Sequence, residues 1–286
     1  MGKVVVLGGS GIHDSPSFED LEWKVINTGL SNGHGDGAIY YQERDDGVIF
    51  IPRHGHGDAR YGPSITQYKA NLLAAKMLGA SVVIATSAVG SLRPDEISVG
   101  NLVVPDDYID ETGRDDNMFG TGIVVHTNPR PAFSEGLRQI LLETAQEGDY
   151  FNGVINGGTY VTIPGDRFGT TAEGLKRAAY AHIVGMTACP EASIAMQLGL
   201  HYAVAAFPVD IDTDANHESG TLAVMRELSK PHRVPAYIEK VIERAKVFAE
   251  NEPLLLQLQG NIIPGDIKRI SNPNLRRIAQ ELVSQY

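Results

Sequence analysis

The sequence has little of what disulfide-rich, metal-clustered or membrane-spanning proteins need. Cys189 is its single cysteine, so no disulfide can form within the chain and no cysteine-based metal cluster is available. The residues around it, Glu191 included, are typical of an ordinary helix, which predicts a small, buried packing residue at Cys189. No stretch approaches the roughly 18 apolar residues of a membrane span, and the first residues do not form a secretory signal, so we expect a cytoplasmic protein.

The sequence also contains fewer basic than acidic residues. The 286 residues include 24 Lys and Arg against 35 Asp and Glu, which gives a formal net charge of −11. Such a chain lacks the basic surface that neutralises a nucleic-acid backbone or anionic lipids, so we expect neither nucleic acid nor a membrane as partner. A local basic pocket for one small anion is still allowed. Hydrophobic residues make up 42% of the chain, enough for a sizeable core.

Short apolar runs alternate with helical patterns along the whole chain. Strands are predicted at residues 4–7, 48–51, 81–85, 102–105, 154–163, 183–186 and 202–209. Helices are predicted at residues 65–78, 131–144, 171–180 and 190–198. The remainder, over residues 222–248 and 273–283, is predicted to be mostly helical, with Pro and Gly marking the breaks. No repeat or Pro/Ser-rich linker interrupts this alternation, so it predicts one α/β domain over residues 1–286.

Polar or glycine-rich residues follow five of the predicted strands, at residues 8–11, 53–54, 87–88, 186–187 and 210–212. In open α/β sheets, ligands bind beyond the carboxyl ends of the strands, so five such ends predict one composite pocket. The glycine turn at residues 8–11 lacks the Lys-Ser/Thr ending of a P-loop. It also lacks the last glycine of a dinucleotide fingerprint, because position 14 is Asp14.

Several of these residues suit an anion. Arg53 offers a planar fork of donors, and His54 can add another. The neutral donors that would surround the same anion are Ser10, Ser87, Ala88 and Thr187, and such a set holds phosphate without Mg²⁺. His54 and His56 could instead suggest a metal site, but no third and fourth ligand stand at a recognisable spacing, so we predict no metal.

Asp210 and Asp212 lie two residues apart just after a predicted strand. In an extended segment both side chains point to one side and can face one ligand. Paired carboxylates can keep one member protonated, which is the arrangement that general acid catalysis needs. Asp214 extends the acidic run, and a solvated acidic loop is the alternative interpretation.

Seven blocks of sequence resemble the purine nucleoside phosphorylase family, and within it the branch that acts on methylthioadenosine. They are VVVLGGSGIHD (4–14), PRHGH (52–56), YKANLLAAKMLGA (68–80), IATSAVGSL (84–92), TIPGDRFGTTAE (162–173), VGMTACPEASIAMQLGL (184–200) and VDID (209–212). Their order and approximate spacing match the family over nearly the whole chain. The resemblance implies an α/β fold with a central mixed, partly barrel-like β-sheet flanked by helices.

The resemblance also implies phosphorolysis, in which a nucleoside and inorganic phosphate give a free base and an α-pentose 1-phosphate, with no cofactor. The phosphate-binding residues that it implies are Ser10, Arg53, His54, Ser87, Ala88 and Thr187. At the nucleoside it implies Met186 at the ribose, Phe168 at the base and Asp210 with Asp212 as catalytic and base-binding residues. The resemblance also implies a homotrimer, in which His126 resembles a residue that reaches the sugar site of a neighbouring subunit.

The preferred base follows from two positions. Family members that prefer 6-oxopurines commonly carry asparagine in place of Asp210 and a glutamate just after Phe168, where this chain has Gly169. A carboxylate can accept a hydrogen bond from a 6-amino group, so we expect adenine. Activity on adenosine, inosine or other 5′-modified nucleosides is the alternative, and a non-catalytic nucleoside-binding relative is a third reading.

Overall fold

Apolar strands with both faces buried form the centre of the fold. The computed structural model describes residues 2–9, 18–214, 221–251 and 262–284. In β1 (Lys3–Gly8), Val5 and Leu7 join one apolar cluster, whereas Val4 and Val6 join the cluster on the opposite face. A run of consecutive apolar residues therefore forms a strand that is covered on both sides, because successive side chains of a strand point to opposite faces.

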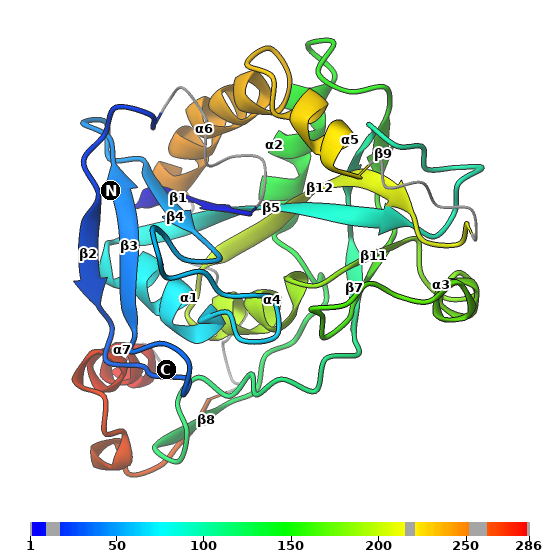
Figure 1. Ribbon diagram of the computed structural model, residues 1–286. Helices are drawn as coiled ribbons and strands as arrows, with labels where there is room; N and C mark the ends of the chain where they lie inside the picture. Colours follow the sequence, from blue (N-terminus) through cyan, green and yellow to red (C-terminus); the bar gives the residue numbers. More distant parts are fainter. Residues whose placement is uncertain (1, 10–17, 215–220, 252–261, 285–286) are drawn as a thin grey trace.

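Eleven strands of the described chain form one mixed sheet in the order β2-β3-β4-β1-β5-β11-β10-β7, with a branch from β5 through β12 and β6 to β9 (Figure 1). The remaining strands are β2 (Lys24–Asn27), β3 (Ala38–Glu43), β4 (Ile49–Pro52), β5 (Ala80–Ser91), β6 (Leu102–Val104), β7 (Asp107–Asp110), β8 (Ile123–Val125), β9 (Val154–Asn156), β10 (Thr159–Thr162), β11 (Ile183–Gly185), β12 (His201–Ile211) and β13 (Ile262–Pro264). The strand β5 is parallel to β1 and β12 and antiparallel to β11. The predicted mixed central sheet is confirmed, and it branches at β5.

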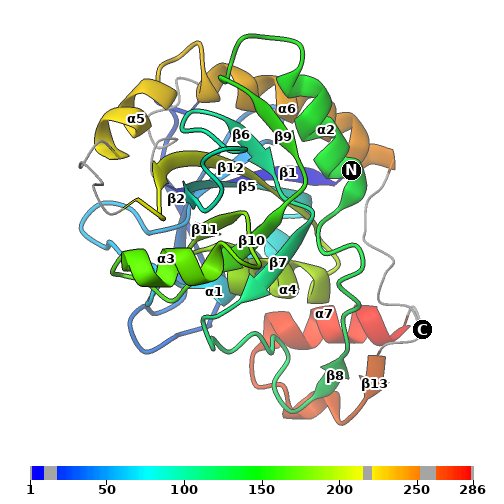
Figure 2. The same ribbon diagram turned by 90° about the vertical axis from the view of Figure 1, so that its right-hand side faces the viewer.

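Helices cover both faces of this sheet. They are α1 (Tyr68–Met77), α2 (Glu135–Ala145), α3 (Thr171–Arg177), α4 (Ala188–Gln197), α5 (Thr221–Leu228), α6 (Val234–Asn251) and α7 (Pro273–Ser284), with a short 3-10 turn η2 (Ile267–Arg269). Helices α1 and α4 pack on one face, and α2 and α6 pack on the other (Figures 1 and 2). None of the helices in the described ranges is both long and apolar enough to cross a membrane.

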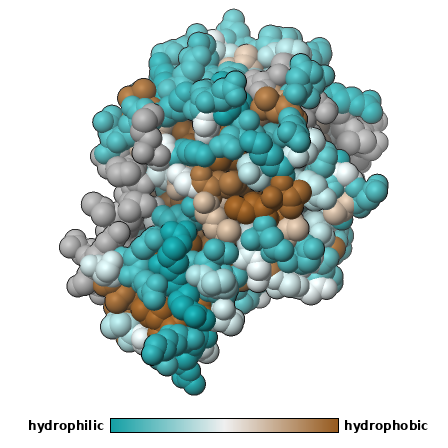
Figure 3. All heavy atoms as spheres, turned by 90° about the vertical axis from the view of Figure 1, so that its left-hand side faces the viewer, coloured by the Kyte–Doolittle hydropathy of each residue, from teal (hydrophilic) through white to brown (hydrophobic). Residues whose placement is uncertain are grey.

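The C-terminal part of the described chain is mostly helical, as predicted, with proline at the break. Residues 222–248 belong to two helices, α5 and α6, because Pro231 lies between them and Pro235 stands in the first turn of α6, where a missing N–H is tolerated. The hairpin of β2 and β3 was not predicted. Its edge strand β2 exposes Lys24, Val25 and Asn27 to solvent. Figure 3 shows this side of the molecule, where an apolar patch near the middle of the face is surrounded by hydrophilic residues.

Candidate active site

The cavity opens where two partners of β5 leave a space along that strand. Strand β1 pairs with β5 up to Ala85, and β11 pairs with it from Gly90. Between these two registers, residues 86–89 border the cavity. The prediction that Ser87 and Ala88 follow the end of a strand is wrong, because β5 continues through them alongside β12.

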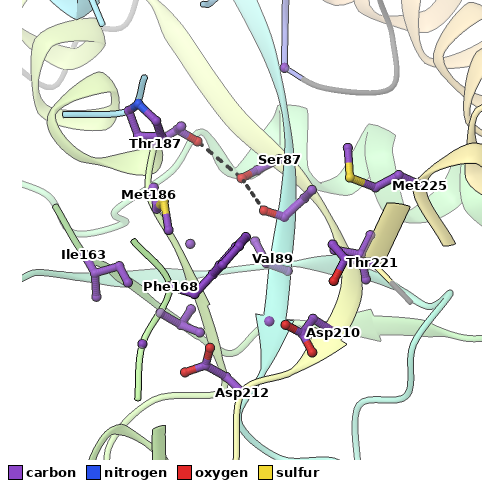
Figure 4. A pocket seen from close by; sticks show the side chains of 18 of the residues that line it. Ser87, Val89, Ile163, Phe168, Met186, Thr187, Asp210, Asp212, Thr221 and Met225 are labelled. Carbon is purple, nitrogen blue, oxygen red and sulfur yellow. Dashed lines mark hydrogen bonds between the residues drawn. The ribbon is translucent and has the colours of Figure 1, made fainter. Parts of the chain in front are cut away.

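At one end of the cavity, hydroxyl groups from three elements meet. Ser87 Oγ lies 2.9 Å from the hydroxyl of Tyr160. It also lies 3.3 Å from Thr187 Oγ1 (Figure 4). Burial raises the pKa of Tyr160, so its hydroxyl keeps its proton. Thr187 directly precedes α4, whose backbone is non-helical at Cys189. This end of the cavity therefore presents neutral hydrogen-bond donors.

Arg53 follows β4 and borders the same cavity, with 2% of the residue exposed. Its Nε and Nη2 donate to the two carboxylate oxygens of Glu191 at 2.6 and 3.1 Å, and its Nη1 donates to Thr86 O at 2.7 Å. Burial by itself lowers the pKa of Arg53, but the charge of Glu191 outweighs it and holds the pKa above its ordinary value. The interpretation of Glu191 as part of ordinary helix surroundings is wrong, because its carboxylate is fully buried and pairs with Arg53.

His54 lines the cavity beside Arg53. Its Nδ1 lies 3.0 Å from Tyr61 O and 3.0 Å from Thr66 Oγ1. A carbonyl only accepts, so the bond to Tyr61 places a proton on Nδ1, and Nε2 then donates to an anion only when the ring is cationic. His56 instead stacks on Trp23, with ring centroids 3.7 Å apart. Within the described ranges, no group of three or more His, Cys, Asp or Glu residues could hold a metal ion.

Asp210 and Asp212 border the cavity on the side opposite the hydroxyl groups (Figure 4). A register shift just before Asp210 keeps this residue in β12, opposite Gly90 of β5. The backbone N–H of Asp212 donates to a carbonyl of β5 at 2.9 Å. The predicted loop after residue 209 is thus the last part of a strand, and that strand brings both carboxyl groups to one ligand cavity.

Helix α3 packs directly against Asp212, and two glycines make this approach possible. A Cβ atom at Gly174 would lie 2.0 Å from the backbone oxygen of Asp212. A Cβ atom at Gly169 would lie 3.0 Å from Asp212 Oδ2 and 3.3 Å from Arg177 Nη1. Arg177 in turn donates through Nε to Glu111 at 3.0 Å. The carboxyl of Asp212 is therefore backed by a second arginine–glutamate pair.

Phe168 and Met186 border the same cavity from the loop before α3 and from the end of β11. Phe168 is 69% exposed, although it is a large apolar residue. An aromatic ring this exposed beside two carboxyl groups offers a flat apolar face to a ligand. Figure 4 shows Phe168 between the aspartates and the hydroxyl groups.

Arg114 holds the loops that shape this part of the cavity. Its two terminal nitrogens donate, at 2.6–2.9 Å, to four backbone carbonyls, those of Pro63, Pro164, Met186 and Cys189. Its guanidinium lies over the ring of Tyr68, 4.7 Å from the centroid. Cys189 itself is buried as predicted, and burial raises the pKa of its thiol to about 12. Arg114 thus ties together three segments that are far apart in the sequence.

Two predicted site residues remain, Ser10 and His126. Ser10 lies outside the described residues. His126 is exposed just after β8 and does not border the cavity in the part of the chain that is described. The sequence reading missed Glu191, Tyr160, Arg114 and Arg177. The one available signal for Glu191 was a charged residue in an otherwise apolar helix, a few residues after a predicted strand.

The cavity thus belongs to an α/β protein that has donors for a small anion at one end. At the other end it has an aromatic ring and two carboxyl groups for a second ligand. Residues 3–238 match the Phosphorylase superfamily, and the chain belongs to this family. The S-methyl-5′-thioadenosine phosphorylase of Pyrobaculum aerophilum is 36% identical over 259 residues, covering 88% of this chain and 87% of that protein. The enzyme of the same name from Hyperthermus butylicus is 40% identical over 216 residues, covering 73% and 76%.

Solved structures give the same picture. A methylthioadenosine phosphorylase sourced from an antarctic soil metagenomic library matches with a TM-score of 0.78 and 28% identity, covering 97% of this chain and 98% of that one. A mutant adenosine/methylthioadenosine phosphorylase from Schistosoma mansoni, in complex with methylthioadenosine, matches with a TM-score of 0.75 and 28% identity, covering 91% and 99%.

Proposed function

We propose that the chain is a pentosyltransferase that cleaves 5′-methylthioadenosine, or a closely related 5′-deoxyadenosine nucleoside, with inorganic phosphate. The products are adenine and the 5-substituted α-ribose 1-phosphate. The observation that carries this proposal is one cavity with anion donors at one end and two aspartates at the other, in a member of the phosphorylase superfamily. Relatives named for this activity cover most of the chain.

The phosphate would bind between Arg53, His54, Ser87, Ala88 and Thr187, all of which border one end of the cavity. Ser10 is proposed for the same site from the sequence alone. The ribose would lie against Met186 and the base against Phe168, between the phosphate and the aspartates. This order places the anomeric carbon between the attacking oxygen and the leaving base, as an in-line displacement requires.

The chemistry follows from charge development. As the glycosidic bond breaks, the sugar becomes oxocarbenium-like and the purine gains negative charge. A protonated carboxyl at Asp210 donates to N7 and makes the base a better leaving group. The phosphate anion stabilises the sugar cation and then attacks the anomeric carbon, so catalysis is mainly positioning and electrostatics. Inorganic phosphate is a co-substrate, and no other cofactor is needed.

Adenine is the proposed base because Asp210 and Asp212 are carboxylic acids and Gly169 leaves no side chain beside them. A glutamate at position 169 would start 3.0 Å from Asp212 Oδ2 and would bring a second carboxylate against it. A 6-amino group, in contrast, donates to a carboxylate. The exposed ring of Phe168 can then stack on the adenine.

We also propose a cytoplasmic homotrimer in which each chain forms one domain. His126 is exposed and away from its own cavity, as a residue would be that serves the sugar site of a neighbouring subunit. Sedimentation analysis combined with an activity assay tests this. A dilute monomer with full activity would contradict it.

The decisive test of the activity is adenine or hypoxanthine release from methylthioadenosine, adenosine and inosine, each with and without phosphate. We expect adenine release from methylthioadenosine that depends on phosphate. Release without phosphate would reject phosphorolysis, and faster release from inosine would reject the adenine assignment. Faster cleavage of adenosine would move the 5′ preference from methylthio to hydroxyl. Nucleoside binding without any cleavage would identify a non-catalytic relative.

A further inference from the structure

The most deeply buried charge pair at the cavity is that of Arg53 and Glu191, whose side chains are 1% and 0% exposed. A guanidinium carries five N–H donors. Glu191 accepts from Nε and Nη2, and Thr86 O accepts from Nη1. These bonds leave one N–H on Nη1 and one on Nη2, so a further anion can meet only the outer edge of the guanidinium.

That outer edge faces the cavity wall at Gly9. A Cβ atom at Gly9 would lie 2.9 Å from Arg53 Nη1, and Gly9 itself borders the cavity. A residue without a side chain therefore keeps this edge of Arg53 accessible. The interpretation that the whole planar fork is available to phosphate needs correction, because the carboxylate of Glu191 already occupies one edge of it.

Glu191 is itself held in place from the far side. The hydroxyl of Tyr202, on β12, donates to Glu191 Oε2 at 2.8 Å. Glu191 lies on α4, and Thr187 directly precedes this helix, with the non-helical residue Cys189 between them. The carboxylate that orients the arginine and a hydroxyl at the anion end are therefore only four residues apart in the chain.

We propose that Glu191 is a positioning residue, which fixes the outer edge of Arg53 toward the co-substrate anion, so that the anion binds through directed hydrogen bonds. The inference rests on the proposed function. It makes chemical sense because a guanidinium held through one edge presents its remaining N–H groups to an anion in one fixed direction.

The test uses two variants that separate the effect of side-chain charge from the effect of side-chain length. Glu191→Gln keeps the length and removes the charge, whereas Glu191→Asp keeps the charge and shortens the side chain. Ser193→Ala, on the same helix but bonded only to the backbone at Pro190, is the matched control. The dissociation constant of inorganic phosphate alone is measured by calorimetry, and KM is measured separately for phosphate and for methylthioadenosine.

Positioning predicts that both Glu191 variants weaken phosphate binding about tenfold or more, because a charge-assisted bond is lost or misdirected. KM for the nucleoside should change by no more than about twofold, as for interactions at independent sites. Tighter phosphate binding in Glu191→Gln, or a normal dissociation constant in Glu191→Asp, would overturn the proposal in favour of charge alone. An equal rise of both KM values would indicate general loosening instead and also overturn it.

Tyr202→Phe provides a variant that leaves the buried ion pair intact. We expect about a two- to threefold weaker phosphate affinity, the effect of one neutral hydrogen bond. If both Glu191 variants fail to fold, an unchanged phosphate affinity in Tyr202→Phe rejects the proposal. Because calorimetry uses phosphate without nucleoside, a wild-type protein that binds phosphate but does not cleave the nucleoside would reject the proposed function and leave this inference testable.

Discussion

At one end of the cavity, Arg53 and Glu191 lie inside the fold, with 1% and 0% of their side chains exposed. At the other end, Arg177 and Glu111 pair beside Asp212 with 11% and 29% exposed. Each end is thus backed by one arginine–glutamate pair, but only the first pair is excluded from solvent. Breaking a buried pair leaves an uncompensated charge, whereas a pair near the surface is easily replaced by water.

The helices and strands that carry the two ends of the cavity differ in burial as the two ion pairs do. The anion end is built from β4, β5 and α4, which pack into the main apolar clusters. The nucleoside end is built from the last residues of β12, from the short helix α3 and from loops tied by Arg114. The comparison suggests that the anion site is rigid before any ligand binds. The nucleoside site depends on contacts each of which is weaker than the buried ion pair at the anion end.

The largest effect is expected at the nucleoside end, where one group carries out chemistry. Asp210→Asn should lower turnover of the adenine nucleoside by about 10²–10⁴-fold, because an amide cannot deliver the proton to N7. Phosphate affinity should stay unchanged, since Asp210 lies across the cavity from the anion donors. Steady-state kinetics and phosphate calorimetry measure both. Asp214→Asn, an exposed acid in the same run, is the control, and near-normal turnover in Asp210→Asn would remove its acid role.

The two ion pairs should differ strongly in stability. Arg53→Met leaves the buried carboxylate of Glu191 without its charge partner and should reduce the free energy of unfolding by about 3–5 kcal/mol. Arg177→Met leaves Glu111 close to water and should cost about 1 kcal/mol or less. Urea unfolding of both variants measures the difference. The double variant Arg53→Met with Glu191→Leu should recover most of the loss, and equal costs for the two single variants would contradict the comparison.

Arg114 offers a way to loosen the loops of the nucleoside end, and two of its carbonyl partners, Met186 and Cys189, also flank Thr187. Arg114→Lys keeps the charge but cannot reach four carbonyls from one planar group. We expect KM for the nucleoside to rise about tenfold, because the loops that carry Pro63 and Pro164 lose a shared charged donor. The phosphate dissociation constant should rise less, by about threefold, because Arg114 acts on the anion end only through the backbone on either side of Thr187. A matching rise for phosphate would show that the two ends are not independent.

Much of the anion end could be predicted from the sequence. Consecutive apolar residues identify strands buried on both faces, and the polar residues after them identify the pocket, because ligands bind at strand ends. Arg53 and Thr187 stand out in this way. The full lengths of β5 and β12 could not be predicted, because Thr86, Ser87 and Asp210 look like strand terminators until the pairing between the two strands is known.

The partners of these residues could not be predicted either. Glu191 is 138 positions from Arg53, and nothing local in either segment indicates the pairing. Arg114 joins carbonyls, which carry no sequence signal at all, and the approach of α3 to Asp212 depends on glycines whose role only the packing reveals. Local patterns therefore predict which residues face the site. The contacts that hold them depend on the tertiary fold.

The smallest effect concerns the exposed pair and its pH dependence. Partial burial by itself raises the pKa of Glu111, but the hydrogen bonds from Tyr180 and Arg177 outweigh it and hold the pKa below its ordinary value. In the unfolded chain the pKa of Glu111 returns to about 4.3, so the carboxylate binds a proton more readily there than in the folded protein. Its contribution to stability is therefore present above about pH 4.3 and is lost as the pH falls through the lower pKa of the folded protein.

Urea unfolding measures this contribution. The free energies of unfolding of wild type and Glu111→Gln should differ by about 1 kcal/mol or less at neutral pH, because the pair is partly exposed, and they should converge in acid. A difference that grows as the pH falls would show that Glu111 is held at the nucleoside end in its protonated form.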